Sequence, residues 1–210
     1  MEFDQIIKKL EKLLSLPLPG KMGQITMAPK PIDEARFAEL KPHNPRKGAV
    51  LMLFYPDERG TLVPFIKRPD YDGTHGGQVA FPGGKWEESD KDLSQTALRE
   101  TEEEIGIDQL KVKLLGKLSD LFIPPSNFLV SPYIGFVEEK PTFIPDPFEV
   151  ERIISCPIEM LTDKAIRKEG EILIRKEYRL HAPYFDIEEQ MVWGATAMML
   201  GEFMYLWENN

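Results

Sequence analysis

The sequence predicts a single domain of the α/β class, in which strands and helices are mixed along the chain. Two apolar runs, residues 48–56 and 61–69, are typical of neighbouring strands joined by the turn DERG. Helical spacing of apolar residues predicts one helix over residues 93–106 and a second, strongly apolar helix over residues 188–208. A length of 210 residues is enough for one domain with a sizeable core.

Apolar spacing also predicts the other elements. Residues 3–14 are expected to form an amphipathic helix that docks on the rest of the protein, and residues 32–40 a short helix within a proline-rich connection. Ser89, with Asp92 three residues later, is expected to cap the helix at 93–106. The remaining strand-like segments are residues 78–84, 110–120, 131–139, 150–163 and 170–180, and a short helix is expected within 150–163.

The composition narrows the class of function. The formal net charge of −9 argues against non-specific binding to nucleic acid or anionic membranes, because both require a basic surface. Cys156 is the single cysteine, which excludes an internal disulfide and a zinc site built on several thiolates. The first residues carry no signal-peptide pattern, and no apolar run has the length of a membrane span. We therefore expect a cytoplasmic protein.

The segment RETEEEIG, residues 99–106, concentrates negative charge on one helix. Glu100, Glu103 and Glu104 are three or four residues apart, so their carboxylates share one face, whereas Glu102 lies off this face. The like charges repel one another, and they lie near the C-terminal end of the helix, where the helix dipole disfavours anions. Because two electrostatic preferences are broken together, a functional site is indicated.

Carboxylates that converge on one face predict a site for Mg²⁺ or Mn²⁺, since these ions prefer oxygen ligands. A carboxylate that does not bind the cation can orient or deprotonate water. The alternative is a solvated acidic face, stabilised by an ion pair between Arg99 and Glu103. The pair Gly83-Gly84 before the helix favours the site, because two glycines permit a turn that brings a main-chain carbonyl towards a cation.

With these residues the sequence resembles the Nudix hydrolases, whose motif is Gly-x5-Glu-x7-Arg-Glu-U-x-Glu-Glu-x-Gly-U, where U is aliphatic. The matching residues are Gly84, Arg99, Glu100, Glu103, Glu104, Gly106 and Ile107. Asp90 fills the acidic position, with a gap to Arg99 that is one residue longer than usual, and Thr101 stands at an aliphatic position.

The longer gap and its surroundings resemble one branch of this family, the coenzyme A pyrophosphatases. The upstream motif of that branch, which ends in His-x-Gly and Phe-Pro-Gly-Gly, is matched by Arg68, His75, Gly77, Phe81, Pro82, Gly83 and Gly84. Pro69 stands at a usual Ser or Thr, and Gly73 stands about where an arginine is expected. The resemblance covers residues 48–208.

The resemblance implies an α/β/α sandwich with a mixed β-sheet: a Nudix hydrolase domain at residues 48–210, preceded by an N-terminal helix and connecting extension at residues 1–47. It also implies Mg²⁺- or Mn²⁺-dependent hydrolysis of the pyrophosphate of coenzyme A or acyl-coenzyme A, giving adenosine 3',5'-bisphosphate and 4'-phosphopantetheine. The implied site residues are Glu100, Glu103, Glu104 and the Gly84 carbonyl for the metal, Glu103, Arg99 and Glu100 for catalysis, and Arg68, His75 and Lys85 for the substrate.

Alternatives stay open at this point. The substrate can instead be ADP-ribose, a nucleotide sugar or a nucleoside triphosphate, and a different class of function is a non-catalytic nucleotide-binding module. The general base is Glu103 or a carboxylate of a later loop, with Asp146, Glu149, Glu151, Glu188 and Glu189 as the candidates. The expected partner is a small-molecule nucleotide, with no nucleic acid and no membrane. Residues 1–47 can shape the pocket or contribute to a dimer contact, so a homodimer stays open.

Overall fold

The structure is a computed structural model that describes residues 1–30, 43–70, 76–174 and 178–210. The strands of its larger sheet are β1 (Arg46–Asp57), β2 (Gly60–Lys67), β3 (Val79–Ala80), β4 (Gly83–Lys85), β5 (Lys113–Lys117), β6 (Leu121–Ile123), β7 (Phe128–Phe136) and β8 (Arg152–Pro157). Along this sheet the order is β3-β2-β1-β7-β5, while β4 pairs with β1, β6 with β7 and β8 with β2. β1 runs parallel to β7, and its pairs with β2 and β4 are antiparallel, so the sheet is mixed.

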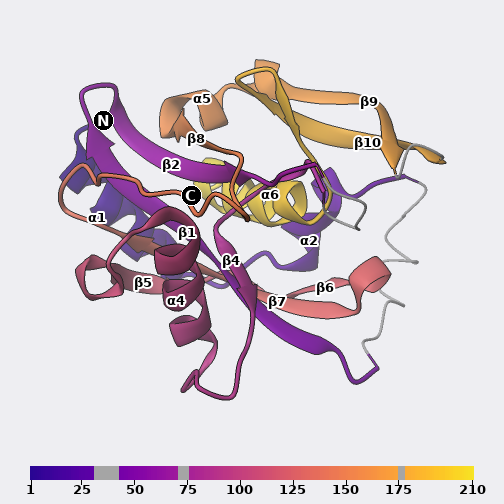
Figure 1. Cartoon of the computed structure of the whole chain (residues 1–210). Coiled ribbons are helices and arrows are strands. Elements are labelled where there is room, and N and C mark those ends of the chain that lie inside the picture. Colours follow the sequence, from indigo (N-terminus) through magenta and orange to yellow (C-terminus); the bar gives the residue numbers. More distant parts are fainter. Residues whose placement is uncertain (31–42, 71–75, 175–177) are drawn as a thin grey trace.

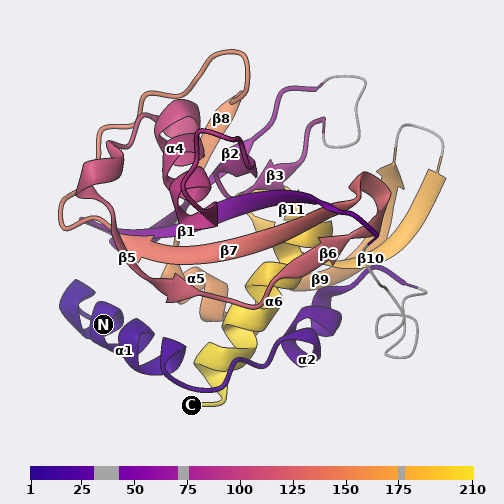
Figure 2. The same ribbon diagram turned by 90° about the horizontal axis from the view of Figure 1, so that it is seen from below.

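Helices cover both faces of this sheet. The α-helices are α1 (Phe3–Leu14), α2 (Lys21–Gln24), α4 (Leu93–Ile105), α5 (Ile158–Thr162) and α6 (Gly194–Glu208), and the short 3-10 helices are η1 (Ile25–Met27), η2 (Gln109–Lys111), η3 (Pro124–Ser126) and η4 (Lys164–Ile166). Figure 2 shows α4 on one face of the sheet and α1, α2 and α6 on the opposite face. The predicted α/β/α sandwich with a mixed sheet is therefore confirmed.

Side chains of β1 alternate between the two faces of the sheet, so this strand contributes to the hydrophobic cluster on each face. Leu51 and Leu53 are fully buried in the cluster that includes Ala97 of α4, while Met52 and Phe54 are fully buried in the cluster on the other face. Because both faces of β1 are covered, the strand is apolar throughout its central part, as its sequence predicts.

The predicted N-terminal helix is confirmed as α1, and it docks on the protein's own core. Ile6, Leu10 and Leu13 of α1 are buried in the same cluster as Phe203 of α6. The predicted helix at residues 32–40 lies outside the described residues, and the division of the chain after residue 47 stays a prediction.

Two elements near the C-terminus differ from the prediction. The strand-like run at 170–180 belongs to two strands, β9 (Arg167–Ile174) and β10 (Tyr178–Ile187), which pair antiparallel and join β11 (Gln190–Val192) in a second sheet. The C-terminal helix begins at Gly194 rather than at Glu188, because Glu188 and Glu189 adopt positive φ in the turn between β10 and β11. Residues 188–193 therefore turn and pair before the helix begins.

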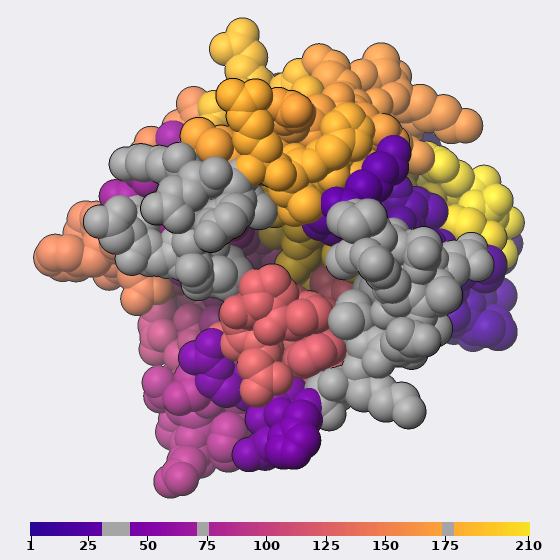
Figure 3. All heavy atoms as spheres, turned by 90° about the vertical axis from the view of Figure 1, so that its right-hand side faces the viewer, coloured from indigo at the N-terminus to yellow at the C-terminus, as the bar shows by residue number. Residues whose placement is uncertain are grey.

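The β9–β10 hairpin extends along one edge of the molecule (Figure 1). Figure 3 shows that hairpin, in orange, across one side of the surface, with the η3 region in salmon below it. Within the described residues, no helix combines the length and the apolar character needed to cross a bilayer.

Candidate functional site

Helix α4 carries the acidic cluster and is fixed at both ends. The Asp92 carboxylate accepts from the backbone N–H groups of Ser94 at 2.8 Å and Gln95 at 3.1 Å, so Asp92 is the N-cap. The prediction that Ser89 caps the helix is wrong, because Ser89 lies in the turn before Asp92. Gly106 ends the helix at a φ of 73°, a left-handed conformation that glycine adopts without strain.

The inner side of α4 holds it against the sheet. Ala97, Thr101 and Ile105 recur every four residues on this side and are buried, whereas Leu93 is only partly buried. Thr101 stands where the family motif has an aliphatic residue, and its hydroxyl donates to the Ala97 carbonyl at 2.7 Å. The buried hydroxyl is therefore paired within the helix, and the neighbouring side of α4 carries the acids.

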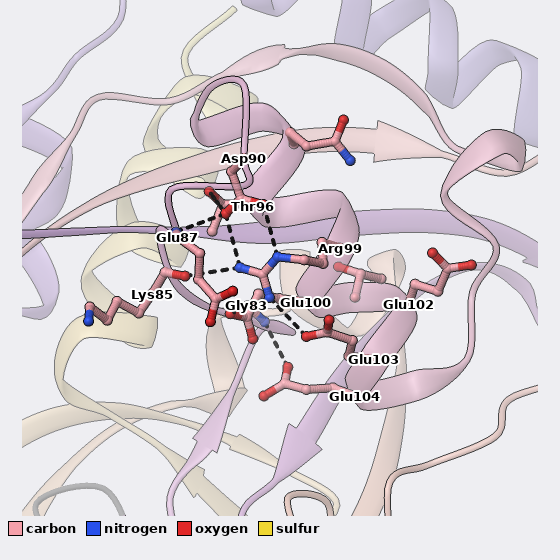
Figure 4. Close-up of polar contacts among 12 residues, drawn as sticks. Gly83, Lys85, Glu87, Asp90, Thr96, Arg99, Glu100, Glu102, Glu103 and Glu104 are labelled. Atoms are coloured by element: carbon pink, nitrogen blue, oxygen red, sulfur yellow. Dashed lines mark hydrogen bonds and ion pairs between the residues drawn. The ribbon is translucent and has the colours of Figure 1, made fainter.

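Arg99 is the centre of the polar contacts on that side (Figure 4). Its Nε and Nη2 donate to the two carboxylate oxygens of Asp90 at 2.9 and 3.0 Å, and Nη2 also donates to the Lys85 carbonyl at 3.0 Å. Nη1 donates to Glu100 Oε1 at 3.1 Å and to Glu103 Oε2 at 2.8 Å. The proposed ion pair with Glu103 is confirmed, and Arg99 orients three carboxylates at once.

Asp90 anchors Arg99. It is 5% exposed, and its Oδ2 also accepts from the Thr96 hydroxyl at 2.8 Å and the Glu87 N–H at 3.0 Å. The hydrogen bonds from Arg99 are the main reason that the pKa of Asp90 is lowered to about 2. The longer gap between Asp90 and Arg99 is thus compatible with a two-oxygen contact between the side chains.

Glu104 is the most deeply buried acid of the cluster, with 1% exposure. Its Oε2 accepts from the Gly83 N–H at 2.8 Å and its Oε1 from Arg68 Nη2 at 3.1 Å. Arg68 Nη2 also donates to the Gly83 carbonyl at 3.2 Å. Burial raises the pKa of Glu104 to about 8, although Arg68 and the Gly83 N–H act in the opposite direction.

Glu100 lies directly against Gly84. A Cβ atom on Gly84 would lie 2.4 Å from Glu100 Oε2, so the Glu100 carboxylate fills the space that a side chain at position 84 would need. Burial raises the pKa of Glu100, and Arg99 lowers it. Gly83 adopts a φ of 148°, and a Cβ there would lie 2.3 Å from the Ala49 carbonyl oxygen, so both positions require glycine.

The structure brings together most of the predicted site residues. Five of them lie together around the C-terminal half of α4, namely Arg68, Gly84, Arg99, Glu100 and Glu104. Glu103 is linked to this group by its ion pair with Arg99, although its side chain is 60% exposed. Lys85 contributes its carbonyl to Arg99, while its ammonium group points away from the glutamates in Figure 4. His75 lies outside the described residues.

Sequence reasoning missed the contacts of Gly83. Its N–H and its carbonyl both face the site, where they meet Glu104 and Arg68. The signal available in the sequence was Gly83, the first glycine of the pair, which was read only as part of a turn. The assignment of the Gly84 carbonyl to a metal stays a prediction, and Gly83 joins it as a candidate.

Comparison with known proteins identifies the family of this chain. A family model described as the NUDIX domain matches residues 45–176. The chain belongs to the Nudix family. It is 38% identical over 185 residues to "Nudix hydrolase 15, mitochondrial" of Arabidopsis thaliana, which covers 84% of this chain and 62% of that protein. It is 32% identical over 159 residues to "Uncharacterized Nudix hydrolase NudL" of Pectobacterium atrosepticum, covering 75% of this chain and 81% of that protein.

Solved structures show the same Nudix fold. A MutT/nudix family protein from Enterococcus faecalis superposes with a TM-score of 0.52 at 15% identity, over 85% of this chain and 71% of that one. The chain spans 62% and 53% of the lengths of two Arabidopsis relatives, Nudix hydrolases 15 and 22.

The later acidic residues of this Nudix chain differ in their surroundings. Asp146 uses its Oδ1 to accept from the N–H groups of Phe148 and Glu149, and Glu151 pairs with Lys67 Nζ at 2.7 Å. Glu188 and Glu189 lie in the turn between β10 and β11. Among these later acidic residues, Glu149 is the one that acts on the site: burial is the main cause that raises the pKa values of Glu100 and Glu104, and the negative charge of Glu149 raises them further.

The loop that carries Glu149 is fixed against the acidic helix. The Ile144 N–H donates to the Ile105 carbonyl at 2.9 Å and the Asp146 N–H donates to the Glu104 carbonyl at 2.9 Å. Val150, next to Glu149, is 4% exposed in the same cluster as Ile105. These contacts hold residues 144–150 beside the C-terminal end of α4.

The donor set suits a hard divalent cation. Glu100 and Glu104 offer carboxylate oxygens and Gly83 offers a carbonyl oxygen, which are the ligand types that Mg²⁺ and Mn²⁺ prefer. Because Gly84 has no Cβ atom, its backbone can lie close to the Glu100 carboxylate. In the part of the chain that the structure describes, no group of three or more histidine, cysteine and acidic side chains already encloses a metal position.

Proposed function

We propose that this Nudix protein is a pyrophosphohydrolase that depends on Mg²⁺ or Mn²⁺ and cleaves the diphosphate of coenzyme A or acyl-coenzyme A. The products are adenosine 3',5'-bisphosphate and 4'-phosphopantetheine or its acylated form. The observation that carries the proposal is the buried Glu104, 1% exposed and facing Arg68 and the Gly83 backbone beside Glu100. A buried acid beside further acids is costly, and a divalent cation offsets that cost.

In this proposal the protein's groups have separate tasks. Glu100, Glu104 and a carbonyl of the Gly83-Gly84 pair hold the cation, with Glu103 at the exposed side. Arg99 orients Glu100 and Glu103, since its donors are directed at protein oxygens. Arg68 binds a phosphate oxygen of the substrate. A bound Mg²⁺ or Mn²⁺ supplies positive charge that neutralises the diphosphate and makes phosphorus more electrophilic.

We assign the general base to Glu149, with Glu103 as the alternative. Two observations support Glu149: its loop is hydrogen-bonded to the end of α4, and its charge acts on both Glu100 and Glu104. Asp146 and Glu151 already have local partners, so neither is free to take a proton from water.

The coenzyme A assignment rests on the sequence motif that contains Arg68, His75 and the Phe-Pro-Gly-Gly segment. Since Gly73 stands about where that motif has an arginine, ADP-ribose, nucleotide sugars and nucleoside triphosphates are the substrates to compare. We further propose a cytoplasmic protein, and we leave a homodimer open.

The test is a substrate panel. The full chain is incubated with Mg²⁺ or Mn²⁺ and coenzyme A, ADP-ribose or dNTPs, and the products are separated by chromatography. We expect adenosine 3',5'-bisphosphate and 4'-phosphopantetheine from coenzyme A. If coenzyme A stays intact while another compound is cleaved, the substrate assignment is wrong; if a nucleotide binds and nothing is cleaved, the protein is a non-catalytic module.

The same panel includes matched variants. We expect Glu104→Gln and Glu149→Gln each to lower kcat by about 100-fold or more, because a buried ligand or a general base contributes at this scale. Glu102→Gln is the control, since Glu102 is on the same helix and contacts Gln109 instead of the site. Undiminished turnover in Glu104→Gln would contradict the metal role.

A further inference from the structure

Arg68 contacts the same oxygens that are expected to bind the cation. Its Nη2 donates to Glu104 Oε1 at 3.1 Å and to the Gly83 carbonyl at 3.2 Å. We propose that Arg68 and the divalent cation compete for these two oxygens, and that cation binding releases the Arg68 guanidinium to the substrate diphosphate. The proposal rests on the proposed function. It makes Arg68 a substrate-binding residue that couples cation binding to substrate binding.

The hydrogen bonds of the two arginines differ. Arg99 uses Nε, Nη1 and Nη2 to reach oxygens of Asp90, Glu100, Glu103 and Lys85 at 2.8–3.1 Å. Arg68 directly follows β2, and its hydrogen bonds to Glu104 and Gly83 both come from the single nitrogen Nη2. Among the residues that the structure describes, exchange of Arg68 therefore breaks fewer side-chain hydrogen bonds than exchange of Arg99.

Charge repulsion explains why the Arg68 guanidinium and a divalent metal ion exclude each other at Glu104. Glu104 is 1% exposed, so its carboxylate needs a positive partner, and Arg68 supplies one in this structure. A divalent cation on Glu104 Oε1 supplies more charge and repels the guanidinium at short range. A guanidinium that leaves Glu104 still lies beside the site, and its planar fork matches the oxygens of a diphosphate.

The backbone of Arg68 is fixed, so only the side chain has to move. The Arg68 N–H donates to the Gln78 carbonyl at 3.0 Å, and the preceding Lys67 is paired in the sheet with Arg152 of β8. The Arg68 side chain is 23% exposed, which leaves it access to solvent. Lys67 is a suitable comparison, because its Nζ contacts Glu151 at 2.7 Å and not the glutamates of α4.

The experiment measures cation binding without substrate. The full chain and the variants Arg68→Gln, Arg68→Lys and Lys67→Gln are treated with EDTA, dialysed and titrated with Mn²⁺ in a calorimeter. We expect Arg68→Gln to bind Mn²⁺ about 5-fold more tightly than the wild type or better, the usual lower range of coupling between sites. Arg68→Lys should bind Mn²⁺ more tightly than the wild type but less tightly than Arg68→Gln, and Lys67→Gln should match the wild type.

A second measurement separates competition from structural support. In EDTA, Arg68→Gln should melt at a lower temperature than the wild type, since Glu104 loses its partner, while added Mn²⁺ should raise its melting temperature by more than it raises that of the wild type. If coenzyme A is cleaved, the KM of both Arg68 variants should rise. A structural role alone predicts weaker Mn²⁺ binding in both variants.

The proposal is overturned if both Arg68 variants bind Mn²⁺ no more tightly than the wild type, or if no form of the protein binds it. Arg68→Lys keeps a positive charge next to Glu104, so it decides the question if Arg68→Gln does not fold. The titration contains no substrate. A failure to cleave coenzyme A therefore contradicts the proposed function alone, whereas unchanged Mn²⁺ affinity in an active protein contradicts the competition alone.

Discussion

Asp90 determines the direction of the Arg99 side chain, which in turn holds two glutamates of the site. Asp90 is buried and the Arg99 side chain is 17% exposed, and two hydrogen bonds at 2.9 and 3.0 Å join them. Such a pair is strongly destabilising to break, because the remaining charge is left buried without a partner. A single carboxylate outside the cation site thus controls the positions of Glu100 and Glu103.

We expect the Asp90–Arg99 pair to make folding stability sensitive to acid. The pKa of Asp90 is lowered from 3.8 to about 2 in the folded protein, chiefly by Arg99. A lowered pKa means that the contribution is fully present above the unfolded value and is lost as the pH falls through the folded value. The expected loss between pH 5 and pH 2 is about 2 kcal/mol.

Urea unfolding of the wild type and Asp90→Asn in EDTA measures this contribution. Asp90→Asn should be less stable by about 3 kcal/mol at pH 7, and the difference should shrink by about 2 kcal/mol towards pH 2. Glu102→Gln serves as the control on the same helix, with its contact to Gln109. A difference between wild type and Asp90→Asn that does not vary with pH would contradict the assigned role.

At the scale of elements, the site depends on how closely β4 approaches α4. Gly84 of β4 pairs with Ala49 of β1, and the position that a Cβ atom on Gly84 would take is filled by the Glu100 carboxylate. We expect Gly84→Ala to weaken Mn²⁺ binding by about 10-fold or more, a typical effect of misplacing a ligand. The reason is that the new Cβ would lie 2.4 Å from Glu100 Oε2 and 2.5 Å from its Cδ, so the carboxylate must turn away.

Calorimetric titration of Gly84→Ala with Mn²⁺ tests this close approach. Gly116→Ala is the control, because Gly116 is also in a strand and a Cβ there would lie 3.4 Å from Leu14 Cδ1, an ordinary contact. We expect the control to bind Mn²⁺ like the wild type. Equal affinities in both variants would show that the Glu100 carboxylate is not required in its present position.

The elements differ in how far the sequence predicts them. β1, β2, α1 and α4 follow from apolar periodicity, which is local in the chain. The β9–β10 hairpin and the start of α6 at Gly194 depend on how β9, β10 and β11 pair and on the positive φ of Glu188 and Glu189, so an apolar run alone did not predict where the chain turns.

The site, like the fold, has a part that local spacing in the sequence predicts and a part that depends on packing. Helical spacing predicts that Glu100, Glu103 and Glu104 share a face, and the structure agrees for their contacts with Arg99 and Gly83. The partner of Glu104, Arg68, directly follows β2, and the carbonyl of Gly83 comes from β4. Their meeting depends on the packing of three elements, which residue spacing along the chain does not contain.

At the scale of the whole molecule, one buried acid of α6 connects the N-terminal extension to the core. Glu202 is 0% exposed, and its Oε1 accepts from the N–H groups of Gly20 at 3.1 Å and Ser119 at 3.2 Å. Its Oε2 accepts from Gln24 Nε2 at 2.9 Å. The helices are in close contact here, since a Cβ on Gly23 of α2 would lie 2.7 Å from the Glu202 Cα.

We expect Glu202→Ala to lower the free energy of unfolding by about 3 kcal/mol, because the buried donors of Gly20, Ser119 and Gln24 lose their acceptor. Proteolysis should then cut first within residues 15–30, the segment that Glu202 holds against α6. Urea unfolding and limited proteolysis with mass spectrometry measure the two effects. Glu11→Ala is the control, since Glu11 is exposed on α1. If Glu202→Ala unfolds and is cleaved like Glu11→Ala, the extension is held by its apolar contacts alone, through residues such as Ile6 and Leu10.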